Sequence, residues 1–194
     1  MHDFRGVMQS FLSSVIGFVS DKLRSPRQMH CRMLSLLRVG LPSPMTMSVM
    51  LFQPSQADVR RFFCTVYAKA LANHPLEAIE TIASLWIDEH PEYHAALADV
   101  DAALLAMAYA DAGKTNAFMH LSMHLALSEQ CSIDQPRGIR QAVELLTARR
   151  DSLHDAHHEA MDCLGTMVWE SQRAGLPPDG PAYIDCVQRR ATRD

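Results

Sequence analysis

Residues 116–130 read Asn-Ala-Phe-Met-His-Leu-Ser-Met-His-Leu-Ala-Leu-Ser-Glu-Gln, and this stretch decides the fold. At about 100° per residue, its apolar side chains cover the whole circumference of a helix and not one stripe of it. A helix that is apolar all round is normally buried on all sides. The stretch therefore predicts a central helix, with Thr115 as its N-cap and other helices packed around it.

Further helical patterns lie on both sides of this stretch, marked by capping residues, prolines and a closing glycine. The expected helices cover 56–73, a segment from Pro75, a segment from Pro91, 95–112, 139–150, 151 or 152 to 174, and a short segment from Pro181. The loop after the central helix is expected at 131–138. No segment alternates apolar and polar residues with period two, as a half-buried strand would. The sequence predicts an all-α, compact bundle of about six to seven helices.

Composition excludes several classes of protein. The chain has 194 residues, of which 48% are hydrophobic and 21% charged, so it has enough apolar side chains for a folded core and is not disordered or collagen-like. Its formal net charge of -4 provides no general attraction for nucleic acid or for an anionic membrane. The longest apolar stretch near the N-terminus, residues 11–19, is far shorter than the roughly 18 residues that a membrane-spanning helix needs. We expect no nucleic-acid partner and no membrane span.

Five cysteines form an odd set without a C-x-x-C pair, which is typical neither of a disulfide framework nor of a zinc ribbon. We expect reduced thiols, with Cys163 serving only in packing, and a cytoplasmic location. Residues 1–49 carry a formal charge of +4 against -8 for the remainder, and seven of the 12 methionines lie in the first 50 residues. We therefore expect a single all-α domain over 50–194. Residues 1–49 would be a separate helical or disordered extension, either a mis-assigned start or a flexible basic arm.

His120 and His124 lie four residues apart on the predicted central helix, so both imidazoles face the same side and are close enough to share a metal ion. Leu121 and Ser122 follow His120, which excludes the H-E-x-x-H signature of zinc proteases. The alternative is a pair of buried histidines that hydrogen-bond to protein groups.

The helix predicted after Ser152 places His154, His158 and Asp162 in one strip, while His157 faces the side of Met161. Two antiparallel helices would then supply His120, His124, His158 and Asp162 as ligands for zinc, iron or manganese. Glu129 and Glu170 are candidates for a carboxylate that hydrogen-bonds to a metal ligand, or for a general base. The alternative is a solvated surface of His and Asp. His90 and His94 form a further four-residue pair at a helix entry, where partial exposure favours a non-ligand role.

Six blocks of the sequence together resemble a known bacterial family, the domain of unknown function (DUF1841). The blocks occur in order at 52–63, 75–79, 90–94, 115–130, 132–136 and 163–172, and the similarity covers roughly 50–189. The resemblance implies that His120, His124, Glu129 and His158 belong to blocks typical of the family. It implies no activity or cofactor, because we associate none with the family.

Two functional hypotheses follow. The leading one is a non-catalytic cytoplasmic helical domain that binds a protein partner or assembles as a homo-oligomer through an apolar helix face. The alternative is a metal-binding helical bundle with metal-dependent hydrolase or transferase activity. The two differ in geometry, because a single metal site requires His120, His124 and His158 to converge.

Overall fold

The computed structural model describes residues 55–107 and 116–192. The predictions for residues 1–49 and for Cys31 therefore lie outside the described residues. Within the described part every regular element is helical and no strand occurs, which confirms the all-α prediction. The elements are α3 (Gln56–Leu71), α4 (Ala78–Asp88), η3 (Pro91–Tyr93), α5 (His94–Leu97), α6 (Val100–Leu105), α7 (Ala117–Ile133), α8 (Ile139–Arg150), α9 (Leu153–Ala174) and α10 (Gly180–Thr192).

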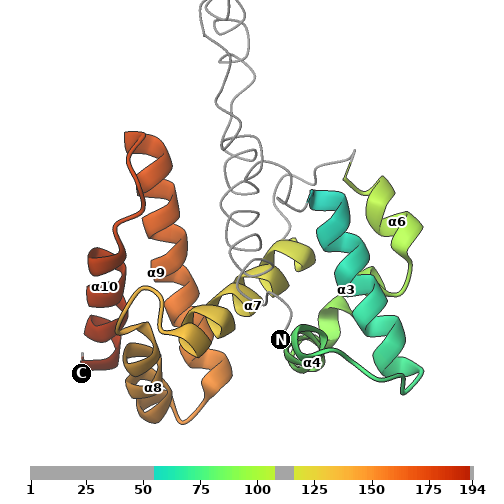
Figure 1. The fold of residues 1–194 in the computed structure, drawn as a ribbon, viewed down its shortest axis with the longest axis horizontal. Coiled ribbons are helices and arrows are strands. Elements are labelled where there is room, and N and C mark those ends of the chain that lie inside the picture. Colours follow the sequence, from blue (N-terminus) through green and yellow to red (C-terminus); the bar gives the residue numbers. More distant parts are fainter. Residues whose placement is uncertain (1–54, 108–115, 193–194) are drawn as a thin grey trace, which may run out of the picture.

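Helix α7 is central, as predicted. Its side chains Leu121, Leu125, Ala126 and Leu127 are all buried, although they point in different directions around the helix. In Figure 1, α3, α4 and α6 lie on one side of α7, whereas α8, α9 and α10 lie on its other side. Helix α7 packs against α4 and also against α9. It is therefore shared by both groups of helices.

Two hydrophobic clusters correspond to these two groups. The first core combines α3, α4, α5, α6 and the first half of α7, and includes Phe63, Trp86, Ile87, Phe118 and Leu121. The second core combines the second half of α7 with α8, α9 and α10, and includes Leu127, Ile139, Leu146, Leu164 and Val187. The border between the two cores crosses α7 between Leu125 and Leu127, next to the predicted ligand His124.

The ends of two helices show which capping predictions were right. Ser55 and Asp58 form the expected capping box at the start of α3. Helix α7 is capped by Asn116, whose side-chain oxygen accepts hydrogen bonds from two backbone N–H groups, so the prediction of Thr115 was wrong by one residue. The loop predicted from Cys131 was also wrong, because α7 continues to Ile133 and ends with Asp134 in the left-handed conformation at φ 52°.

The alanine-rich segment differs from its prediction as a single helix over 95–112. Helix α5 ends at Leu97, and a new helix, α6, begins after Asp99. The Asp99 carboxylate accepts hydrogen bonds from the backbone N–H groups of Asp101 and Ala102. This local capping interaction outweighs the helix propensity of the surrounding alanines and creates a break. Residues 108–112 of the predicted helix lie outside the described part.

Cys163 on α9 and Cys186 on α10 form a disulfide, with their Cα atoms 5.9 Å apart. The expectation of reduced thiols, and of a purely packing role for Cys163, was therefore wrong for this pair. The cause is tertiary: α9 and α10 pack side by side, which brings together cysteines 23 residues apart in the chain. Cys64 and Cys131 are free. None of the described helices combines the length and the apolar character needed to span a membrane.

Candidate metal centre

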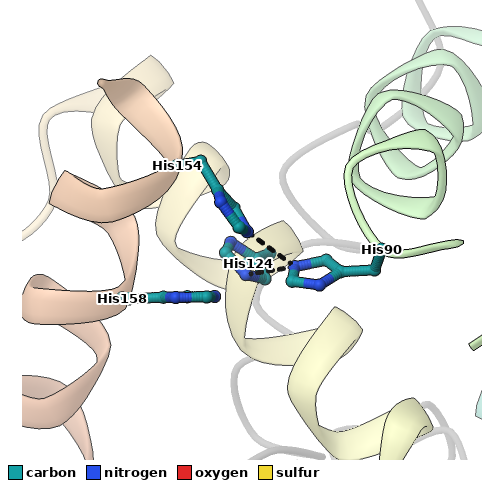
Figure 2. Close-up of side chains that lie close together, drawn as sticks. All are labelled: His90, His124, His154 and His158. Atoms are coloured by element: carbon teal, nitrogen blue, oxygen red, sulfur yellow. Dashed lines mark hydrogen bonds between the residues drawn. The ribbon is translucent and has the colours of Figure 1, made fainter. Parts of the chain in front are cut away.

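Six histidines from three parts of the chain meet where the two cores adjoin. His90 lies between α4 and η3, His120 and His124 lie on α7, and His154, His157 and His158 lie on the first two turns of α9. Figure 2 shows His90, His124, His154 and His158 with their rings pointing toward one another. One ligand atom from each of these four lies within 4.8 Å of the corresponding atom of every other. The spacing of four along α7 and α9 explains the local arrangement, because residues i and i+4 share a helix face.

Five of the six histidines approach one another through their Nε2 atoms. The separations are 3.2 Å from His154 to His90, 3.0 Å from His90 to His124, 3.2 Å from His124 to His120 and 3.1 Å from His120 to His158. These contacts link the first core to the second through α7. They form a continuous series of nitrogen atoms.

His90 is oriented by a carboxylate. The Nδ1 atom of His90 lies 2.9 Å from Oε1 of Glu92, and this hydrogen bond lowers the pKa of Glu92 below its usual range. Because an ionised carboxylate only accepts hydrogen bonds, Nδ1 of His90 carries the proton. A neutral His90 therefore presents a lone pair at Nε2. The arrangement is the same as the carboxylate–histidine pairing that orients metal ligands in other proteins.

His124 is fully buried and held by aromatic stacking. The ring of Trp86 stacks on the His124 ring with a centroid distance of 4.2 Å, and the Trp86 ring centroid also lies 4.3 Å from that of His157. Trp86 is itself fixed, because Nε1 donates to the Ser128 hydroxyl, which in turn donates to the His124 carbonyl. On the other edge of the His124 ring, Nδ1 of His124 lies 3.4 Å from Nδ1 of His157. His157 therefore contacts His124 at the nitrogen that does not face the other four histidines.

Burial keeps several of these imidazoles neutral. Desolvation is the largest cause that lowers the pKa of His120 to about 4 and that of His157 to about 3. The pKa values of His124 and His158 are also lowered, first by burial and then by the neighbouring histidines. These four side chains are neutral at pH 7, and a neutral imidazole is the form that binds a metal ion.

The candidates selected from the sequence fall into two groups. His120, His124 and His158 come together, whereas Asp162, Glu129 and Glu170 are not in the converging set. Oδ2 of Asp162 accepts a hydrogen bond from Nη1 of Arg190 on α10, at 3.1 Å. Glu129 is buried on α7, and this burial raises its pKa to about 7. Glu170 lines a cavity of about 290 Å³ beside the Cys163–Cys186 disulfide.

Sequence reasoning did not select His90 and His154 as ligands. The four-residue spacing of His154 and His158 repeats that of His120 and His124 and was the available signal. His90 was predicted to be a non-ligand because it was paired with His94, four residues later in the sequence. The Nε2 atom of His94 lies 3.0 Å from the Ile87 carbonyl, to which it donates, so only one member of that pair reaches the other histidines.

The fold and the site define an all-helical domain with a partly buried cluster of histidines. A family model matches residues 55–189, and the chain belongs to this family, the Domain of unknown function (DUF1841). The predicted resemblance is thereby confirmed over nearly the expected range. No curated protein and no solved structure matches the chain.

Proposed function

We propose that this domain binds a divalent transition-metal ion through the Nε2 atoms of His90, His124, His154 and His158. One observation carries the proposal: the nitrogen atoms converge more than hydrogen bonding requires. A neutral Nε2 atom has either one N–H or one in-plane lone pair, so it makes one good hydrogen bond. In a series of five atoms with four contacts, no more than two contacts can then be hydrogen bonds.

Nε2 of His90 lies beside Nε2 of both His124 and His154 and can hydrogen-bond to only one of them, and an ion bound by all three nitrogens accounts for the other contact. The lone pair of each Nε2 atom would point at the same cation, and no proton would be needed between the rings. The side chains around the cluster support this interpretation, because Glu92 leaves the lone pair of His90 at Nε2 and Trp86 holds the His124 ring in place. The base candidates Glu129 and Glu170 do not belong to the cluster, so we propose metal binding without assigning hydrolase or transferase chemistry.

Elemental analysis tests the proposal. The full chain would be purified without a histidine tag, stripped with a chelator, incubated with Zn²⁺ and dialysed. We expect close to one ion per chain for the wild type and a large loss in the double variant His90→Ala, His124→Ala. His74→Ala is the matched control, because His74 is exposed in the α3–α4 loop and its loss should leave uptake unchanged. Wild-type protein that folds but takes up no ion would contradict the proposal.

A second candidate function is assembly with a protein partner or with another copy of the chain. Several large apolar side chains are exposed, among them Leu105 at 68%, Leu71 at 67% and Leu85 at 61%. Light scattering across a range of protein concentrations would test self-association, and a mass of one chain throughout would oppose it. The cytoplasmic location stays a prediction that cell fractionation would test. The Cys163–Cys186 bond weighs against it, since disulfides persist mainly in oxidising compartments.

A further inference from the structure

The geometry points to a more specific site than four histidines around zinc. We infer that five imidazole nitrogens bind the ion, with His120 as the fifth ligand, and that the site favours nickel(II) or copper(II) over tetrahedral zinc. This inference rests on the proposed function and adds the number of ligands and the class of ion.

The number of donors is the first argument. Nε2 of His120 lies 3.2 Å from Nε2 of His124 and 3.1 Å from Nε2 of His158, so it is as close to its neighbours as the other four nitrogens are to theirs. His120 also lies one helical turn before His124 and on the same face of α7. Added to the four nitrogens that lie within 4.8 Å of one another, His120 would give five donors, which exceeds the four of a tetrahedral structural zinc site.

The separations are the second argument. With metal–nitrogen distances of about 2.0–2.1 Å, tetrahedral ligands lie about 3.3–3.4 Å apart and ligands at right angles about 2.9–3.0 Å apart. The four contacts between neighbouring nitrogens are 3.0, 3.1, 3.2 and 3.2 Å, on average closer to the right-angle value than to the tetrahedral one, and the four nitrogens of His90, His124, His154 and His158 all lie within 4.8 Å of one another. Ligands at right angles are typical of copper(II) and nickel(II) with nitrogen donors.

The chemistry of the donors is the third argument. Among the described residues that converge, every donor is an imidazole and none is a carboxylate. Imidazole suits zinc, copper, iron and nickel, whereas magnesium, calcium and manganese prefer oxygen ligands. The Glu92 carboxylate hydrogen-bonds to the far side of His90, at Nδ1, and does not belong to the four-histidine set. Manganese, included among the ions expected from the sequence, fits this donor set poorly.

Co²⁺ can serve as a spectroscopic probe of the number of ligands, because tetrahedral Co²⁺ absorbs visible light much more strongly than five- or six-coordinate Co²⁺. We expect the stripped wild type to bind one Co²⁺ with weak visible absorption. His120→Ala should bind Co²⁺ at least about tenfold more weakly, with stronger absorption from the four remaining ligands. Alanine suits a helix, and circular dichroism would confirm that the variant folds. His74→Ala should match the wild type in both measurements.

Competition tests the ion class: after dialysis against equal Ni²⁺ and Zn²⁺, the wild type should retain mainly nickel. The outcomes separate the two proposals. Strong, tetrahedral absorption by wild-type Co²⁺ protein, unchanged affinity and spectrum in His120→Ala, or retention of zinc alone would overturn the five-imidazole site while metal binding stands. A wild type that binds none of Co²⁺, Ni²⁺ and Zn²⁺ would overturn the proposed function itself.

Discussion

The first and second cores are built differently on either side of α7. The first core buries the aromatic rings of Phe63, Trp86 and Phe118. Beside it lies the buried side chain of Arg60, whose guanidinium stacks on Phe118 at 4.5 Å and donates to the Ala103 carbonyl, while its Nε atom has no hydrogen-bond partner among the described residues. The second core is mainly aliphatic, and the Cys163–Cys186 disulfide joins two of its helices.

This difference indicates which half is easier to open. Among the described residues, both halves bury a polar atom without a hydrogen-bond partner, Nε of Arg60 in the first and the Tyr183 hydroxyl in the second, and only the second half has a disulfide that restricts its unfolded states. His90 belongs to the first half, and His154 and His158 belong to the second. An ion bound between them would therefore hold the less constrained half to the more constrained one.

The largest expected effect is the increase in the free energy of unfolding when an ion binds between the two halves. Free Ni²⁺ at about a thousand times its dissociation constant should raise the free energy of unfolding by about 4 kcal/mol, because the ion binds only the folded site. Chemical denaturation with and without the ion measures this change. Native-state hydrogen exchange should slow most in α3 and α4. In His90→Ala, which lacks the ligand from the first half, the slowing in those helices should largely disappear. Equal slowing in wild type and variant would refute the connection.

Removing the disulfide should affect the second half. Cys163→Ser together with Cys186→Ser should lower the free energy of unfolding by about 3 kcal/mol, because the closed loop spans 23 residues of separation. Urea denaturation of the oxidised wild type and the double variant measures the loss. The matched control is Cys64→Ser, which removes a free thiol from the first core. Exchange rates in α9 and α10 that stay the same without the disulfide would show that it does not stabilise this half.

Glu129, on the helix that both halves share, should make stability depend on pH. Its pKa rises from 4.5 to about 7 on folding because the carboxyl is buried. The protonated form is thus favoured in the folded state, so this contribution is complete below about pH 4.5 and is lost as pH rises through 7. Glu129→Gln should be more stable than the wild type by up to about 3 kcal/mol at pH 8 and nearly equal at pH 4. Denaturation of both proteins at the two pH values tests this, and an equal difference at both would contradict it.

The smallest effect concerns the break between α5 and α6 in the first half. Asp99→Ala removes the side chain that caps α6 and should cost about 1 kcal/mol. Asp99→Asn keeps an accepting oxygen and should lose less. Thermal unfolding of both variants measures the difference. If the alanine variant were as stable as the wild type, the cap would not account for the break in this alanine-rich segment.

Much of the secondary structure followed from local patterns. The start of α3 at Ser55 and the central position of α7 were predicted correctly, because capping and apolar periodicity act within a few residues. The break at Asp99 was missed because the alanines around it dominated the pattern, although an aspartate that caps a helix was present as a signal. This segment therefore contains the two short helices α5 and α6 where one long helix was expected.

By itself, the sequence determined an all-helical domain of a known family and placed His120 with His124, and His154 with His158, on shared helix faces. Only the tertiary structure decided that His90 joins them, that Asp162 pairs with Arg190, and that Cys163 bonds to Cys186. The physical reason is range. Helix periodicity and capping depend on neighbours within about four residues, whereas these three contacts depend on how helices pack, and spacing along the chain does not encode packing.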